Sequence, residues 1–166
     1  MLCVSKTNRS LSPVAGGGIG KAYAMAFAKE GAKVSLPDIA TADHVVKAIQ
    51  DMGGMAISMK CDVTDEKSVK AMVDATAKQF GTIDILINNA AYFMTVWKGP
   101  FWQMAVDEFD KAMAVNVRGS WLCAKAVVPY MQTQKKGEII HISSNVALTG
   151  SPNYIHYVAS KAQSSP

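Results

Sequence analysis

The 166-residue sequence is poor in several features that would assign it to a special class. It has three cysteines, Cys3, Cys61 and Cys123, an odd number without CxxC spacing, which argues against a disulfide framework or a cysteine-based metal site. Cysteines in this pattern are usually small buried side chains in proteins of a reducing compartment. No apolar run is long enough to span a membrane, and the first residues contain no apolar segment of a secretory signal. We therefore expect a cytoplasmic protein without a membrane partner.

Neither positive nor negative charge is in large excess. The net charge is only +4, and the lysines are scattered along helical stretches without forming a basic run. This pattern gives no support for a nucleic-acid partner. Hydrophobic residues make up 49% and charged residues 18%, the balance of a globular protein. Without repeats, low-complexity tracts or linkers, residues 1–166 are expected to form a single domain.

Apolar periodicity predicts alternating strands and helices. Helices are expected over residues 19–30, about 43–52, 65–80, about 106–131, and from about 153 onward. Strands are expected over 32–36, where Pro37 and Asp38 should end the strand, and over 55–61, 83–88 and 138–143. The last two are apolar enough to be buried strands. This alternation predicts an α/β protein with a doubly wound parallel sheet and helices on both faces.

A glycine-rich loop precedes the first predicted helix. Residues 14–20 read VAGGGIG, and Gly16, Gly18 and Gly20 have the small-residue spacing that lets backbone N–H groups approach a pyrophosphate. Asp38, at the end of the next strand, stands where a carboxylate would accept hydrogen bonds from an adenosine ribose. A flexible glycine turn and a Pro-Asp turn remain the alternative interpretations.

The segment before this loop is a poor central strand. Residues 1–13 offer only the short apolar run Leu2-Cys3-Val4, followed by polar residues and then Pro13, which cannot donate to a strand ladder. We therefore treat residues 1–13 as a divergent N-terminus and a candidate disordered segment.

From residue 14 onward the sequence resembles the classical short-chain dehydrogenase/reductase family. Several ordered motifs at the family's spacing carry the resemblance, which covers roughly residues 14–163. They are Gly18-Ile19-Gly20 of TGxxxGIG, the Asp62-Val63 pair, Asn88-Asn89-Ala90-Ala91 for NNAG, Asn116 in AVNVRG, Ser144 in HISSNVA, and Tyr157 and Lys161 in YVASK. Pro13 and Val14 stand where the family has threonine and its first glycine.

The resemblance implies a Rossmann-like fold and an NAD(P)-dependent oxidoreductase that transfers hydride between nicotinamide and an alcohol or ketone. By resemblance, the catalytic residues are Asn116, Ser144, Tyr157 and Lys161. The cofactor-binding residues are Gly16, Gly17, Gly18, Ile19, Gly20, Asp38, Asp62, Val63, Asn89, Ala90, Tyr157 and Lys161. NAD is expected in preference to NADP, because Asp38 would repel a 2′-phosphate and the glycine loop offers no Arg or Lys to pair with it.

The tyrosine and lysine suit proton exchange with an alcohol. A tyrosine hydroxyl with a pKa near ~10 is a poor base at neutral pH, and an ammonium one helical turn away should lower that pKa. By resemblance, Lys161 would also hold the nicotinamide ribose, Ser144 would bind the reacting oxygen, and Asn116 would anchor a water. Taken singly, each residue has an ordinary structural alternative: a helical pair, a turn after a strand, or a kink in the long helix.

The loop at 91–105 is unusually aromatic, with Tyr92, Phe93, Trp97, Phe101 and Trp102. It either covers an edge of the core or lines a pocket for an apolar or aromatic secondary alcohol or ketone. His141, on a predicted buried strand, and His156, beside Tyr157, are assigned no catalytic role. No metal-ligand spacing links them, so no metal is expected.

Members of this family usually continue well past the tyrosine helix, so we expect an incomplete domain that lacks the last strands and the substrate lid. The helix of Tyr157 and Lys161 should end soon after Lys161, near fraying backbone. The alternative function is therefore a catalytically inactive fragment that retains at most nucleotide binding or dimerisation. A completed chain is expected to be a homo-oligomer, since family dimers use the long helix and the tyrosine helix.

Overall fold

The computed structural model describes residues 2–5, 18–93 and 95–163. Within them the α-helices and strands are, in chain order, β1 (Leu2–Ser5), α1 (Gly18–Lys29), β2 (Lys33–Asp38), α2 (Asp43–Asp51), β3 (Met55–Lys60), α3 (Glu66–Phe80), β4 (Ile85–Asn88), α4 (Val106–Ala112), α5 (Ser120–Thr133), β5 (Glu138–His141), α6 (Val146–Thr149) and α7 (Ile155–Ala162). A 3₁₀ turn, η1, spans Phe101–Gln103, and a π-helical segment, η2 (Met113–Gly119), joins α4 to α5. The predicted alternation of strands and helices is confirmed.

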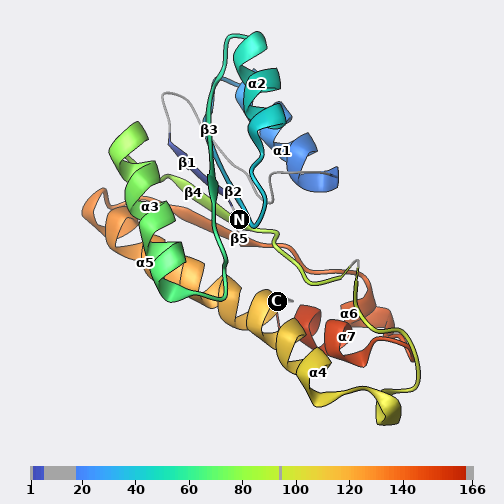
Figure 1. Cartoon of the computed structure of the whole chain (residues 1–166). Helices are drawn as coiled ribbons and strands as arrows, with labels where there is room; N and C mark the ends of the chain where they lie inside the picture. The colour runs from blue at the N-terminus through green and yellow to red at the C-terminus, as the bar shows by residue number, and fades with distance from the viewer. Residues whose placement is uncertain (1, 6–17, 94, 164–166) are drawn as a thin grey trace.

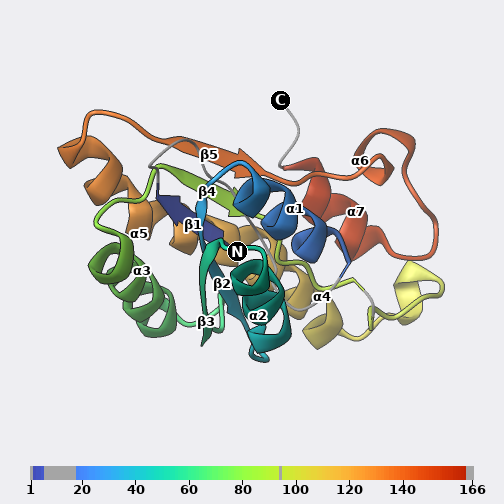
Figure 2. The same ribbon diagram turned by 90° about the horizontal axis from the view of Figure 1, so that it is seen from above.

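The strands form one five-stranded sheet in the order β3-β2-β1-β4-β5, with helices on both faces (Figures 1 and 2). Helices α1 and α2 pack with β2 and β3 around a core that includes Val34, Leu36 and Ile49. Helices α3 and α5 cover the other face around a second core that includes Met72 and Leu86. This three-layer arrangement confirms the predicted Rossmann-like α/β class.

The first strand departs from the expected parallel sheet. β1 takes the central position but runs antiparallel to both neighbours, pairing Cys3 with Ser35 on β2 and Leu2 with Ile87 on β4. The pairs β2–β3 and β4–β5 are parallel, as predicted. A parallel β1 would have to run straight into the glycine loop, where the sequence has polar residues and Pro13. The apolar run Leu2-Cys3-Val4, which forms β1, is separated from that loop by this polar stretch.

Two further strand predictions were wrong in detail. Pro37 and Asp38 do not end β2 but belong to it, paired with Met59 and Lys60 of β3. Proline is tolerated there because the described pairing of β1 with β2 reaches only Ser35. β5 was expected to be buried, yet three of its four residues are exposed, because it is the last strand of the described sheet.

The expected long helix is present as a rod from α4 through η2 to α5 (Figure 1). Gly119, at the end of the π-helical segment, lets this rod approach the end of β3 closely. A Cβ at this position would lie 2.8 Å from the Cγ2 atom of Val63. The N-terminal part of the rod, α4 and η2, packs against α7, which follows α6 at the C-terminal side of the molecule (Figure 1). In the described part of the chain, no helix is long and apolar enough to cross a membrane.

Candidate active site

A small hollow lies beside the carboxyl ends of β2 and β3, with a volume of about 120 Å³. Its lining consists of Pro37, Asp38, Ile39, Cys61, Asp62, Val63, Ala90, Ala91 and Val115. Four of the predicted cofactor residues, Asp38, Asp62, Val63 and Ala90, are therefore brought together here. In α/β sheets of this type, ligands bind at the carboxyl ends of the strands.

Local hydrogen bonds fix the polar groups around this hollow. One oxygen of Asp62 accepts hydrogen bonds from both the backbone N–H and the hydroxyl of Thr64, each at 2.8 Å. The guanidinium of Arg118 on the long rod donates to the carbonyl oxygen of Thr64 at 3.1 Å. Half-buried Asp38 accepts from the N–H of Ala40 at 3.3 Å. The rim is thus preorganised by contacts within the chain.

The glycine motif is only partly described. Gly18, Ile19 and Gly20 form the first turn of α1, where Gly18 has a φ of +55°, a conformation that favours glycine. Gly16 and Gly17 lie outside the described residues, as do Pro13 and Val14. Asn89 follows the end of β4 and is partly buried, while its neighbour Asn88 donates to the carbonyl oxygen of Ser120 at 3.2 Å.

The four predicted catalytic residues come from three separate segments. Asn116 lies in η2, Ser144 follows β5, and Tyr157 and Lys161 lie one turn apart on α7. Tyr157 and Lys161 are buried, with 8% and 5% of their surfaces exposed. Ser144 hydrogen-bonds to the Tyr157 side chain. The fold therefore brings Ser144, Tyr157 and Lys161 together.

Asn116 connects the remaining parts of the site. Its amide oxygen accepts the backbone N–H of Tyr92 at 2.7 Å, and its amide nitrogen donates to the hydroxyl of Ser160 at 2.8 Å. Ser160 in turn donates to the carbonyl oxygen of Tyr157 at 2.8 Å. Asn116 does mark an irregularity in the long helix, because the π-helical segment surrounds it. The structural alternative, an irregularity in the long helix, is therefore confirmed, and the catalytic role of Asn116 stays a prediction.

Tyr157 and Lys161 do not interact as expected. Burial raises the pKa of the Tyr157 hydroxyl, and the hydrogen bond with Ser144 offsets part of that shift. The predicted lowering of this pKa by Lys161 is not found. The Nζ atom of Lys161 lies 5.9 Å from the centre of the tyrosine ring and donates to the carbonyl oxygen of Ile142 at 2.7 Å. Burial also lowers the pKa of Lys161 itself.

The end of the helix that carries Tyr157 and Lys161 is bonded to other segments. α7 ends at Ala162, close to Lys161 as predicted. However, the hydroxyl of Ser143 donates to the carbonyl oxygen of Lys161 at 2.9 Å, and the Lys161 side chain binds the same strand-end segment. With Asn116 bound to Ser160, the last turns of α7 are held from two sides. Tyr157 and Lys161 therefore lie on backbone that is hydrogen-bonded to other segments, and fraying of this helix end stays a prediction.

The aromatic loop contacts Tyr157 through one of its members. Phe93 packs against the ring of Tyr157, with 4.5 Å between ring centres, and both rings contact Tyr154 at 6.2 Å. Phe101 and Trp102 instead pack on each other and are more than half exposed. Only part of the loop thus borders the tyrosine that is predicted to be catalytic, and the pocket for substrate stays a prediction.

Sequence reasoning missed several residues that build the site. Ser160 and Gly119 could have been noticed, since one lies inside the YxxxK motif and the other is a glycine within a long helix. Glu108, whose carboxylate accepts the hydroxyl of Tyr92, has no signal in the sequence. His156 is fully buried and neither ring nitrogen has a hydrogen-bond partner, whereas His141 is exposed.

The sheet order and the hollow at the carboxyl edge define a Rossmann-like protein. Comparison with known proteins narrows this class. A family model described as enoyl-(acyl carrier protein) reductase matches residues 14–164. An uncharacterized oxidoreductase of Thermotoga maritima is 41% identical over 150 residues, which are 89% of this chain and 58% of that protein.

Solved structures agree. NAD⁺-bound xylitol dehydrogenase superposes with a TM-score of 0.81 at 35% identity, over 89% of this chain and 57% of that one. 7α-Hydroxysteroid dehydrogenase complexed with NADH and 7-oxo glycochenodeoxycholic acid superposes with a TM-score of 0.84 at 37% identity. The match covers 90% of this chain and 58% of that one. The chain belongs to the short-chain dehydrogenase/reductase family. It spans somewhat under two thirds of the length of these relatives.

Proposed function

We propose that the chain carries the site of an NAD-dependent oxidoreductase that interconverts an apolar or aromatic secondary alcohol and the corresponding ketone. The observation that carries this proposal is the hydrogen bond between Ser144 and the side chain of buried Tyr157, with the ammonium of Lys161 5.9 Å from the centre of the same ring. Two relatives with solved structures hold NAD⁺ or NADH, which supports the choice of cofactor. A cytoplasmic location remains our expectation.

The residues around the hollow fit the adenosine half of such a cofactor. Asp38 would accept hydrogen bonds from the ribose hydroxyls, and Asp62 and Val63 would contact the adenine. A 2′-phosphate beside Asp38 would be repelled, which favours NAD over NADP. When bound, the cofactor supplies the hydride acceptor or donor.

The chain's own residues would move the proton. During alcohol oxidation Tyr157 would take the hydroxyl proton as the hydride leaves the carbinol carbon, and in the reverse direction it would return that proton to the ketone oxygen. Ser144 would hydrogen-bond the reacting oxygen. Lys161 would bind the nicotinamide ribose and stabilise the phenolate, after its ammonium exchanges the carbonyl oxygen of Ile142 for these partners. Asn116 would hold the surrounding backbone in place.

Phe93 supports an apolar or aromatic substrate. It lies against the ring of Tyr157 and is 36% exposed, so part of an apolar side chain is accessible beside that ring. Apolar and aromatic walls with few polar groups are typical of sites for small molecules.

The test combines binding with turnover. NADH and NADPH are titrated into the protein by fluorescence, and oxidation of aryl and alkyl secondary alcohols is followed with NAD⁺. Tighter binding of NADH is expected, and Tyr157→Phe should reduce turnover by ~100-fold or more while NADH affinity stays within about a few-fold. Tighter NADPH binding, or a variant that keeps more than about a tenth of the rate, would contradict the assignment.

The second candidate is a nucleotide-binding module without turnover. The reversed β1 favours it, because the strand does not lead into the glycine loop as it should in the family. NADH binding without oxidation of any alcohol in the panel would identify this alternative.

A homo-oligomer is part of the same proposal. The long rod exposes Phe109 and Trp121, which are 38% and 57% exposed, on a helix where family members form their dimers. Large exposed apolar side chains on one helix are typical of an interface between subunits.

A further inference from the structure

Tyr92 is attached to the long rod at both its backbone and its side chain. Its N–H donates to Asn116 at 2.7 Å, and its carbonyl oxygen accepts from the same amide at 3.4 Å. Its hydroxyl reaches the two carboxylate oxygens of Glu108 at 3.2 and 3.0 Å. Glu108 lies about two helical turns before Asn116, so both attachments rest on one helix.

The carboxylate of Glu108 is well suited to hold this hydroxyl. The hydrogen bond from Tyr92 is the main reason why the pKa of Glu108 is lowered, and a further bond from Lys111 at 3.3 Å acts in the same direction. Glu108 is therefore ionised at neutral pH, and the bond from Tyr92 is charge-assisted, the stronger kind of hydrogen bond.

The residue after Tyr92 is the one that contacts the catalytic tyrosine. Phe93 covers one side of the Tyr157 ring and also packs edge-on against Tyr154. The direction of the Phe93 side chain depends on the backbone of Tyr92, so a displacement of Tyr92 would uncover Tyr157. The amide nitrogen of Asn116 does not bind Tyr92 exclusively, because it donates to the hydroxyl of Ser160 as well as to the carbonyl oxygen of Tyr92.

We propose that Tyr92 and Glu108 form a positioning pair that holds Phe93 against Tyr157 and thereby fixes the catalytic ring on its helix. The proposal rests on the proposed function only in taking Tyr157 as the acid/base. Neither Tyr92 nor Glu108 touches the reacting atoms, so both are positioning residues.

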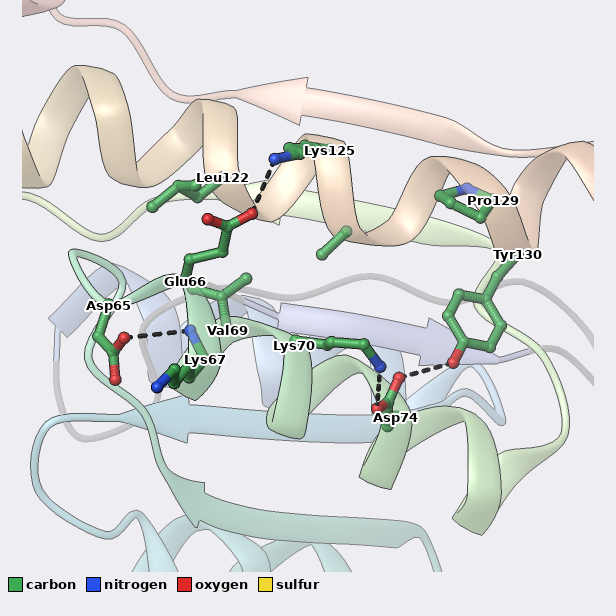
Figure 3. A pocket seen from close by; sticks show the side chains of 11 residues that line it. Asp65, Glu66, Lys67, Val69, Lys70, Asp74, Leu122, Lys125, Pro129 and Tyr130 are labelled. Atoms are coloured by element: carbon green, nitrogen blue, oxygen red, sulfur yellow. Dashed lines mark hydrogen bonds and ion pairs between the residues drawn. The ribbon is translucent and has the colours of Figure 1, made fainter.

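The chain contains a matched control for this pair. Along the groove of about 720 Å³ between α3 and α5, the hydroxyl of Tyr130 donates to Asp74 at 2.8 Å, and Asp74 is paired with Lys70 on the same helix (Figure 3). The chemistry is the same as in Tyr92, Glu108 and Lys111, but this triad contacts no predicted catalytic residue. Tyr130→Phe therefore removes an equivalent hydroxyl far from Phe93.

The experiment uses the whole chain, with its tyrosine rings labelled with ¹³C and followed by NMR through a pH titration. The Tyr157 signal is assigned by its loss in Tyr157→Phe. In the unmodified chain Tyr157 should titrate above the ordinary value near ~10, because it is buried. In Tyr92→Phe its midpoint should fall toward that value, while Tyr130→Phe should leave it unchanged.

Amide hydrogen exchange provides the second measurement. Loss of one charge-assisted bond in Tyr92→Phe should speed exchange of the backbone amide at position 92 by about tenfold, without a comparable change in the amides of β4. A purely structural role would instead accelerate exchange throughout the domain and leave the Tyr157 midpoint in place.

Glu108→Gln guards against a Tyr92 variant that fails to fold. The glutamine oxygen still accepts the hydroxyl but carries no charge, so smaller shifts of the same sign are expected. The proposal is overturned if neither Tyr92→Phe nor Glu108→Gln moves the Tyr157 midpoint, or if Tyr130→Phe moves it equally. NADH binding, measured on the same samples, tests the proposed function separately, since the NMR measurements need no cofactor.

Discussion

Asn116→Ala should destabilise the chain far more than an ordinary surface substitution. The side chain is 3% exposed and makes three hydrogen bonds, two to the backbone of Tyr92 and one to Ser160. Alanine removes all three and leaves the N–H of Tyr92 without its partner. A hydrogen bond contributes about 1 kcal/mol net, and an orphaned buried donor costs roughly 1–3 kcal/mol. The 3.4 Å bond is long and contributes least.

Together these contributions amount to about 3 kcal/mol of unfolding free energy. For a domain of this size, 1 kcal/mol lowers the melting temperature by roughly 2–4 °C, so a fall of roughly 6–12 °C is expected. Asn153→Ala is the control, because Asn153 is exposed and only its backbone oxygen is used, by the N–H of Gly99. Surface substitutions of this kind usually stay within about 0.5 kcal/mol.

Thermal and urea unfolding, followed by circular dichroism, measure both variants beside the unmodified chain. If Asn116→Ala melts within about 2 °C of the Asn153→Ala control, Asn116 does not tie the loop to α7, and the arrangement of the site described above is refuted.

Three other outcomes follow from particular contacts. Gly119→Ala should cost about 1–3 kcal/mol of stability, because its Cβ would lie 2.8 Å from a methyl of Val63, and adding Val63→Ala should restore part of the loss in chemical unfolding. The pKa of Tyr157 is higher in the folded chain than in the unfolded one, so the free energy of unfolding should fall as pH rises above about 10. Urea unfolding at a series of pH values should show a smaller fall in Tyr157→Phe. Trp121→Glu should shift any dimer toward monomer in sedimentation, and an unchanged dimer would exclude this face.

Much of the fold could be predicted because it depends on local pattern. The helix at 65–80 shows its apolar face in the periodicity of Val69, Met72 and Val73, and all three are buried in the structure. The order of strand and helix follows directly from such patterns. The direction of β1 does not, because pairing of a short strand depends on the positions of β2 and β4, which are far away in sequence.

The candidate site shows the same division. Motif spacing predicts which residues lie at the carboxyl edge, and the structure places Asp38, Asp62 and Val63 around one hollow. Motif spacing does not predict which hydrogen-bond partner each polar atom has. Lys161 was expected to act on Tyr157, but the nearest good acceptor for its ammonium is the carbonyl oxygen of Ile142, on a segment nineteen residues earlier. Such choices are decided by packing between distant segments.

The long rod explains how the two halves of the site keep their relative position. Gly119 lets the rod approach Val63 beside the hollow, and Asn116, one turn earlier, reaches Tyr92 and Ser160 beside the predicted catalytic tyrosine. A regular helix would place these two contacts differently, since the π-helical segment that contains them has a wider turn. A change that straightens this segment should therefore disturb both halves together, whereas a change in α2, which packs in the other core, should disturb neither alignment.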